Sequence, residues 1–350
     1  MTKLRVGIAC SPELRNHYLG PVDLARLDAI AEVGIADFDV PGDTWGQIAV
    51  VPEFEQRLAA FAADKDVLLV FHGAPRVTER VFAAAPKLRI VGDIEGDRFA
   101  GRIDVAAAHA AGVLVVDTTH ASSWPVAEWA LALMLIGLRQ NARFRQIIAG
   151  QYMSQQDYRA RPPGRELTGK TVGLIGYGHI GWRLREFLIP FQCPIIAHDP
   201  YAPRELADAQ GVDFASLATV MGCDVVVCLA PATAQTTGMV GEAELALLRE
   251  DAVFVNVSRG TVVDVDALIA RAERGDAWFG LDAHDPEPIA VGSPLRGMSN
   301  VFLSPHIAGV TAEAQPRFFA LMVDELLRFA SGLEPRAQIT DRVVAGRGGS

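Results

Sequence analysis

An arginine, a glutamate and a histidine in the C-terminal half each follow an apolar run typical of a buried strand. Arg259 lies in Val-Asn-Val-Ser-Arg-Gly, Glu287 in His-Asp-Pro-Glu-Pro and His306 in Ser-Pro-His-Ile-Ala-Gly. A guanidinium binds a carboxylate through two parallel hydrogen bonds, and an imidazole exchanges a proton near neutral pH. A carboxylate beside the imidazole favours its charged form and fixes the ring. These three types together suit the reduction of a 2-keto acid, so we take them as the candidate catalytic residues.

Each of these residues also has a structural interpretation. Arg259 could end a strand, Glu287 could be a surface acid in a proline turn, and His306 could be a hydrogen-bonded loop histidine. The catalytic interpretation is favoured because the three occur together, downstream of a dinucleotide-binding motif. Ligands of open α/β sheets bind at the carboxyl ends of the strands, where all three residues are expected.

That motif is a glycine-rich turn that follows an apolar run and opens a helical stretch. Gly176 permits a tight turn, Gly178 lets the backbone approach a pyrophosphate, and Gly181 allows the helix to pack closely on the strand. The phosphates would bind the amides of His179 and Ile180, at the positive end of the helix dipole. The sequence therefore predicts a dinucleotide site at this turn.

The next apolar run ends in an acid, Asp199, at the spacing that the dinucleotide fingerprint requires. Its carboxylate can accept both ribose hydroxyls of NAD and would repel the 2′-phosphate of NADP, so NAD is the predicted cofactor. The alternative is that Asp199 is only a turn residue before Pro200. The predicted cofactor-binding residues are Gly176, Tyr177, Gly178, His179, Ile180, Gly181, Asp199, Pro200, Leu229, Ala230, Pro231, Thr236, Val257, Ser258, Arg259, Asp282, His306, Ala308 and Gly309.

Short apolar runs alternate with helical stretches along the chain, which predicts parallel sheets covered by helices on both faces. In the first part, strands are expected at Leu4–Ala9, Val67–Phe71, Arg89–Val91 and Val113–Val116, and helices at Leu58–Ala63 and Ile103–Ala110. In the second part, strands are expected at Thr171–Ile175, Ile195–Ala197, Val225–Leu229, Val253–Val257, Phe279–Asp282 and Val301–Leu303, and helices at Gly181–Leu188 and Val265–Arg274.

Two longer helices, Trp124–Asn141 and Gln315–Ser331, lie at the edges of the second part. We interpret them as the places where the chain crosses between domains. The predicted fold is α/β, with two doubly wound parallel-sheet domains. A Rossmann NAD-binding domain takes residues 122–310, and a flavodoxin-like substrate-binding (catalytic) domain takes residues 1–121 and 311–350.

Length and composition limit the classes of partner. A chain of 350 residues is long enough for two domains with their own cores. The formal net charge of −10 argues against a nucleic-acid or anionic-membrane partner, because both require a basic face. The four cysteines form no CxxC pair, as expected of reduced thiols in a cytoplasmic protein, and no cluster has metal-ligand spacing. The apolar stretch Ala127–Leu138 is expected to be too short to span a bilayer.

At these residues the chain resembles the D-isomer-specific 2-hydroxyacid dehydrogenase family. The similarity runs from about Val126 to Gly309 and includes the glycine-rich turn and the segments around Arg259, Glu287 and His306. The resemblance implies NAD-dependent interconversion of a small 2-hydroxy acid and its 2-keto acid, with those three residues as the catalytic set. It also implies a homodimer, with the helix Trp124–Asn141 at the interface.

The resemblance assigns further residues to the cofactor. It implies that Asp282 meets the nicotinamide carboxamide and that Pro231 and Thr236 line the adenosine side. Formate dehydrogenases of the family pair their histidine with a glutamine, so Glu287 argues against formate as the substrate.

The substrate loop departs from the family pattern. The family has G-x-G-x-D-N-I-D there, whereas this chain has Gly-Asp-Ile-Glu-Gly-Asp-Arg-Phe-Ala-Gly-Arg-Ile-Asp over 92–104. The change concerns substrate recognition and leaves the residues of hydride transfer in place. The predicted substrate-binding residues are Gly73, Ala74, Glu95, Gly96, Arg98 and Arg259.

Two other functions stay open at this point. A non-catalytic NAD(H)-sensing partner protein can share the fold, and fold does not determine function. A reductase of amino- or phosphite-type substrates can use the same scaffold, although the sequence shows no clear motif for binding a second phosphate or an amine.

Overall fold

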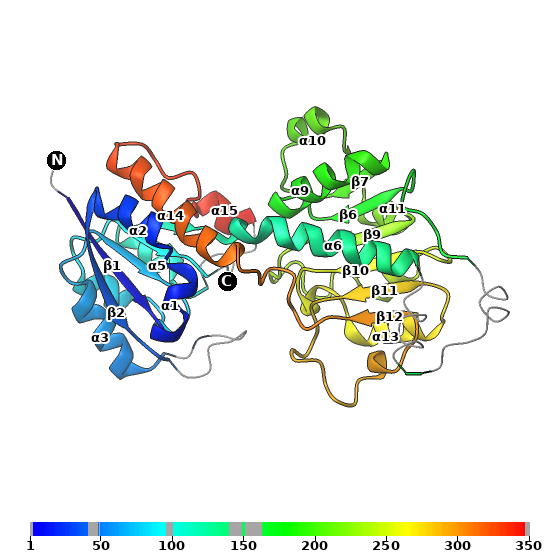
Figure 1. The fold of residues 1–350 in the computed structure, drawn as a ribbon, viewed down its shortest axis with the longest axis horizontal. Coiled ribbons are helices and arrows are strands. Elements are labelled where there is room, and N and C mark those ends of the chain that lie inside the picture. The colour runs from blue at the N-terminus through cyan, green and yellow to red at the C-terminus, as the bar shows by residue number, and fades with distance from the viewer. Residues whose placement is uncertain are drawn as a thin grey trace. The chain divides into compact units, whose positions relative to one another are not determined.

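The computed structural model describes residues 3–40, 48, 50–95, 101–139, 149–150 and 163–346. The chain forms two compact units, each built on a parallel sheet (Figure 1). One unit comprises Met1–Ser122 and Val310–Ala345, and the other contains Ser123–Gly309. The sequence places the boundaries after residues 121 and 310, whereas packing divides the chain after Ser122 and Gly309.

The first unit has a five-stranded parallel sheet in the order β2-β1-β3-β4-β5, the flavodoxin-like arrangement. Its strands are β1 (Leu4–Cys10), β2 (Ala31–Asp37), β3 (Val67–Val70), β4 (Ile90–Asp93) and β5 (Leu114–Asp117). Its helices are α1 (Pro12–Tyr18), α2 (Pro21–Asp28), α3 (Pro52–Ala62), α4 (Glu79–Ala84), α5 (Val105–Ala110), the 3₁₀ turn η1 (Thr119–Ser122), α14 (Ala314–Ala330) and α15 (Asp341–Gly346). The predicted substrate-domain architecture is confirmed.

The second unit has a seven-stranded parallel sheet in the order β12-β11-β10-β9-β6-β7-β8. Its strands are β6 (Val172–Ile175), β7 (Ile195–His198), β8 (Asp213–Phe214), β9 (Val225–Cys228), β10 (Val253–Asn256), β11 (Trp278–Leu281) and β12 (Val301–Leu303). All strands are parallel, but from β6 the chain adds β7 and β8 on one side and then β9 to β12 on the other. The loop after β6 therefore lies at the switch point where open α/β sheets bind ligands. This is the predicted Rossmann architecture.

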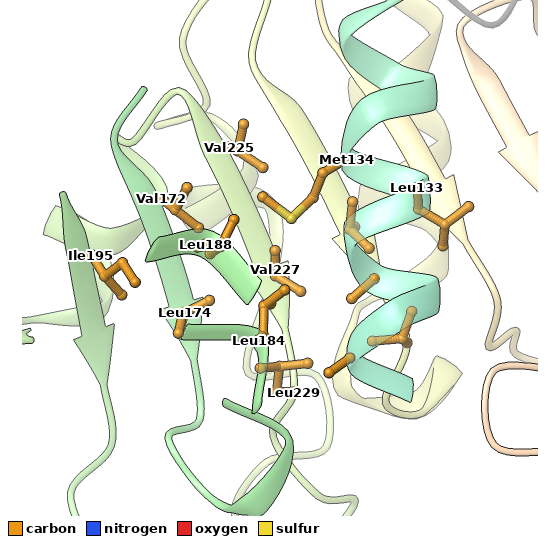
Figure 2. Packing of buried hydrophobic residues seen from close by; sticks show 14 of the residues in the cluster. Leu133, Met134, Val172, Leu174, Leu184, Leu188, Ile195, Val225, Val227 and Leu229 are labelled. Atoms are coloured by element: carbon orange, nitrogen blue, oxygen red, sulfur yellow. The ribbon is translucent and has the colours of Figure 1, made fainter. Parts of the chain in front are cut away.

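Helices cover both faces of this sheet. They are α6 (Ser123–Leu138), α9 (His179–Leu188), α10 (Arg204–Gln210), α11 (Leu217–Met221), α12 (Glu242–Leu245) and α13 (Val265–Glu273), with 3₁₀ turns η2 (Ile189–Phe191), η3 (Gly260–Val262) and η4 (Pro294–Arg296). On one face, side chains of α6 and α9 meet those of the central strands, as Figure 2 shows for Met134, Leu184 and Val227. This apolar layer packs the two helices against the centre of the sheet.

One helical segment among the described residues is long and apolar enough to span a membrane. Thr119–Leu138 has 20 residues and a mean hydropathy of 1.3, so the expectation that this stretch is too short was wrong. The helical segment begins eight residues before the predicted Ala127, because η1 leads directly into α6. Within the second unit α6 packs against α9, β10 and β11 (Figure 1), and a core helix also has this apolar composition.

Candidate active site

The loops after β11 and β12 bring Glu287 and His306 together. Leu281 and Leu303 end these neighbouring parallel strands in register, so the two loops leave the sheet side by side. Nδ1 of His306 lies 2.5 Å from Oε1 of Glu287, and the side chains are 10 % and 19 % exposed. A carboxylate at this distance fixes the orientation of the ring.

Asp282 holds the backbone that presents His306. Its Oδ1 accepts hydrogen bonds from the Ile307 amide at 3.1 Å and the Ser304 hydroxyl at 2.5 Å, and its Oδ2 accepts from the Ala308 amide at 2.9 Å. His306 has a φ of 54°, in the left-handed region that L-residues rarely adopt. The buried Asp282 carboxylate therefore stabilises a turn that aims the histidine.

Asn256 stabilises the turn that carries Arg259. Its side-chain oxygen accepts from the Ser258 amide at 3.0 Å and the Ser258 hydroxyl at 2.9 Å, and its amide nitrogen donates to the Arg259 carbonyl at 3.0 Å. Asn256 ends β10 and is 1 % exposed. The turn after β10 is thus closed by one buried side chain.

Arg259 reaches from this turn to the histidine. Its Nη1 donates to the Ser258 carbonyl at 2.8 Å and lies 3.2 Å from Nε2 of His306. A guanidinium has only donors, so Nε2 is the acceptor in this contact. The three predicted catalytic side chains therefore form one connected group, from guanidinium to imidazole to carboxylate.

Gly260 allows the loop that carries Arg259 to lie close to the loop that carries Glu287. A Cβ at this position would lie 1.9 Å from the His284 carbonyl oxygen and 2.5 Å from the Asp285 nitrogen. Backbone occupies the place where any other residue would put its side chain. The sequence motif contained this glycine, but its role comes from a tertiary contact that spacing alone does not reveal.

The glycine-rich turn has the shape that a dinucleotide requires. Gly176 has a φ of +93°, and a Cβ there would lie 2.9 Å from the Ala230 nitrogen. Gly178 caps α9, and a Cβ built on it would meet no atom within 4 Å, so the approach to its backbone is open. A Cβ on Gly181 would lie 3.1 Å from the Tyr177 ring. The residues therefore fit a pyrophosphate on the helix N-terminus.

Asp199 connects this turn with the end of β7. Its Oδ2 accepts from the Tyr177 amide at 2.8 Å, and its Oδ1 accepts from the Tyr201 and Ala202 amides at 2.9 and 3.0 Å. It therefore caps the turn after Pro200, as the structural interpretation expected, and a carboxylate retains lone pairs for ribose hydroxyls. The same negative charge fits NAD better than NADP.

The other predicted cofactor residues of this unit lie in loops that follow strands. The Thr236 hydroxyl donates to the Pro231 carbonyl at 2.5 Å and so fixes the loop after β9. The side chains of a further group are largely buried, which leaves their backbone for any ligand contact. These residues are Leu229, Ala230, Val257, Ser258 and Ala308.

The predicted substrate residues of the first unit follow β3 and β4. The Ala74 amide closes a turn onto the Phe71 carbonyl at 2.9 Å, and Gly73 has a φ of +82°. Both Glu95 oxygens accept from Nη2 of Arg102, at 2.8 and 2.7 Å, and the two side chains are 5 % and 0 % exposed. The predictions for Gly96 and Arg98 fall outside the described residues.

Arg102 was not predicted from the sequence. It stands in the loop where the family pattern has a short polar residue, and this departure was its only signal. The described residues contain no group of three or more potential metal ligands. Burial raises the pKa of the Cys228 thiol to about 11, so the thiol next to the Ser258 hydroxyl stays protonated at neutral pH.

The dinucleotide turn lies at the switch point of the sheet, and the Arg–His–Glu group follows strands two to four positions away from it. These features define a two-unit α/β protein of the dinucleotide-binding class. Residues 131–308 match the model of the D-isomer specific 2-hydroxyacid dehydrogenase NAD binding domain. The chain belongs to the D-isomer specific 2-hydroxyacid dehydrogenase family, which confirms the resemblance seen in the sequence.

Relatives with known names share much of the chain. It is 30 % identical over 271 residues to D-3-phosphoglycerate dehydrogenase of Archaeoglobus fulgidus, covering 77 % of this chain and 50 % of that protein. It is 31 % identical over 276 residues to glyoxylate reductase of Aeropyrum pernix, covering 77 % and 81 %. The chain thus spans about half the length of the phosphoglycerate dehydrogenases it matches. The fold is also that of apo D-mandelate dehydrogenase from Rhodotorula graminis, with TM-score 0.81, 22 % identity and coverage of 97 % and 98 %.

Proposed function

We propose that the chain is an NAD(H)-dependent 2-hydroxyacid dehydrogenase that interconverts a small 2-hydroxy acid and its 2-keto acid. The observation that carries the proposal is the connected group of Arg259, His306 and Glu287 in the unit that holds the dinucleotide turn. The names of the relatives, which include a dehydrogenase of phosphoglycerate and a reductase of glyoxylate, support the same reaction class.

Each residue has one task in the reaction. A nicotinamide cofactor held at the turn of Gly176 and Gly178 would supply the hydride for the 2-carbon of the keto acid. Arg259 binds the carboxylate through two hydrogen bonds, and His306 donates the proton that the keto oxygen takes up. Glu287 stabilises the imidazolium before that transfer and holds the ring in place throughout. In the opposite direction, neutral His306 accepts the hydroxyl proton.

The test is a panel of keto acids with the purified protein and NADH. Glyoxylate, hydroxypyruvate, pyruvate and longer branched acids sample the size of the substrate side chain, and NADH consumption reports turnover. We expect at least one acid to be reduced, with His306→Ala as an inactive control that still binds NADH. Failure with every acid, under conditions where NADH binds, would support the non-catalytic alternative instead.

We further propose that the protein is a homodimer and that α6 contributes to the interface. Leu131 and Leu135 lie one turn apart on this helix and stay partly exposed in a single chain, next to the exposed Glu128. An apolar helix face that is not fully covered is typical of an interface between subunits. Light scattering should give the dimer mass, and Leu131→Glu with Leu135→Lys should give the monomer mass.

We also propose a cytoplasmic location. Cys10, Cys193, Cys223 and Cys228 are all free thiols in the structure, which suits a reducing compartment. Fractionation of cells that produce the protein should recover it with the cytoplasmic enzymes.

A further inference from the structure

His284 joins the two loops that carry Glu287 and His306. It is a half-buried residue in the loop after β11. Nε2 of its ring lies 2.8 Å from the carbonyl oxygen of Ser304, in the loop after β12. A carbonyl oxygen only accepts, so Nε2 carries a proton and donates this hydrogen bond. Both loops belong to the unit Ser123–Gly309, so the bond lies within one unit.

Short, stiff stretches of chain connect this hydrogen bond to the two catalytic side chains. On one side only Pro305 separates Ser304 from His306. On the other side Glu287 lies three residues after His284 and stands between two prolines. A proline ring fixes φ, which leaves these stretches little freedom to absorb a displacement. A movement at either end of the hydrogen bond is therefore passed on to the histidine and the glutamate.

The backbone at His306 requires support from its surroundings. Its φ of 54° is a conformation that persists only where neighbouring contacts hold it. Asp282 accepts from the two amides that follow the histidine and from the Ser304 hydroxyl. His284 binds the backbone carbonyl that precedes the histidine. The turn is thus held on both sides of the residue that it presents.

Histidines elsewhere in the described part of the chain also bind backbone carbonyls. Nδ1 of His198 lies 3.1 Å from the Ala215 oxygen, and Nε2 of His109 lies 2.9 Å from the Ile339 oxygen. The segments that these two histidines join carry no member of the catalytic group. His284 differs because its hydrogen bond joins the loops of an imidazole and of the carboxylate that orients it.

We propose that His284 is a positioning residue, whose hydrogen bond to Ser304 keeps the Glu287 carboxylate and the His306 ring in contact. The inference rests on the proposed function, because this contact serves the proton transfer of that reaction. No step of the reaction is assigned to the His284 ring itself. A misplacement of about 1 Å in a catalytic group can cost roughly 100-fold in rate, so a bond outside the group can control kcat.

The experiment uses two variants with side chains of similar length. His284→Gln can donate from its amide to the Ser304 carbonyl, whereas His284→Met has no donor, and both lack the ring. His109→Met is the control, because it removes a similar hydrogen bond from the other unit. If His284→Met does not fold, His284→Asn takes its place, since its amide is one carbon shorter than that of glutamine. Steady-state kinetics of the full chain at saturating NADH give kcat and KM, and thermal melting gives Tm.

We expect His284→Met to lower kcat roughly 3- to 10-fold, the range of one hydrogen bond, with the KM for NADH unchanged. His284→Gln and His109→Met should keep kcat within about twofold of the wild type. In a Glu287→Gln background, His284→Met should have little further effect, because the contact that it disturbs is already weakened. Three results overturn the proposal: an unchanged kcat in His284→Met, whatever its Tm; equal losses in His284→Met and His284→Gln; or fully additive losses in the double variant.

Failure of the proposed function gives a different result. If the wild type reduces no keto acid, the dehydrogenase assignment fails, and NMR of the histidine rings then tests His284 without turnover. The signal that disappears in His306→Asn belongs to His306. We expect His284→Met to move this signal toward its position in Glu287→Gln, and His284→Gln to move it less. An unmoved signal in His284→Met, or equal shifts in both variants, overturns the proposal.

Discussion

Nη1 of Arg259 lies 3.2 Å from Nε2 of His306, on the side of the ring opposite Glu287. The guanidinium can only donate, so Nε2 is the acceptor in this contact, while Nδ1 faces the carboxylate. In the proposed reaction, the carboxylate of the keto acid would compete with His306 for the Arg259 guanidinium. Binding of that carboxylate would then free Nε2 of His306 for proton transfer.

Arg259→Lys should impair the enzyme strongly. A single ammonium cannot make the two parallel bonds to a carboxylate that a planar guanidinium makes. We expect kcat/KM to fall roughly 10- to 150-fold, the equivalent of about 1.5–3 kcal/mol of transition-state stabilisation. Steady-state kinetics with the best keto acid measure this loss. Arg249→Lys is the control, since Arg249 is 59 % exposed. Near-normal efficiency of Arg259→Lys would remove Arg259 from the site.

Asp199→Ser should shift cofactor preference toward NADPH, most clearly when combined with an arginine nearby. The substitution removes the negative charge that repels the 2′-phosphate. It also removes the acceptor of the Tyr177, Tyr201 and Ala202 amides, so the Tm should fall as well. The measurement is the ratio of kcat/KM with NADH and NADPH, with the exposed Asp208→Ser as the control. A wild type that prefers NADPH contradicts the prediction.

The sequence predicted the fold from local periodicity, because buried parallel strands are continuous apolar runs. Every predicted strand overlaps an observed one, with ends that differ by one or two residues. The missed strands are β2, in which only one of seven residues is fully buried, and the two-residue β8. Both lie at or near a sheet edge, where one face is exposed and the apolar run is interrupted.

The sequence predicted which three side chains form the candidate catalytic group. Arg259, Glu287 and His306 were found because strand ends are ligand sites, and the structure brings them together. The contacts of Asn256 and Gly260 that support these residues were not predicted. They depend on which backbone atoms come close to these two residues in the folded chain, and spacing in the sequence does not reveal that.

Glu287→Gln should move the pH profile of keto-acid reduction to lower pH. Reduction requires protonated His306, which the Glu287 charge stabilises and the Arg259 charge opposes. Glutamine keeps the size of the side chain but removes its negative charge. The positive charge of Arg259 then remains as the charge beside the ring. The alkaline limb of reduction and the acid limb of hydroxy-acid oxidation should shift together, while Glu250→Gln, at an exposed position, leaves both in place. An unshifted Glu287→Gln profile would show that Glu287 is not the partner of the histidine.

His306→Asn gives the matching test of the proton donor. The asparagine side chain can hydrogen-bond but cannot deliver a proton at neutral pH, so the rate should fall roughly 100-fold or more at every pH. NADH binding should survive, because the pyrophosphate and ribose contacts are expected at the turn around Gly178 and at Asp199, away from His306. Fluorescence titration of NADH checks the affinity, and pH–rate measurements at saturating NADH check the rate.

Gly260→Ala should disable the site without touching any side chain of the catalytic group. The new Cβ would fall 1.9 Å from the His284 carbonyl oxygen, so the loops of Arg259 and Glu287 must separate. Overpacking of this kind costs about 1–3 kcal/mol of folding free energy, and the displaced Arg259 should lower kcat more than NADH affinity. Gly292→Ala is the control, since a Cβ there meets nothing within 4 Å. Denaturant unfolding and steady-state kinetics measure both effects. A folded Gly260→Ala protein with wild-type kcat would mean that close approach of the two loops is not required for catalysis.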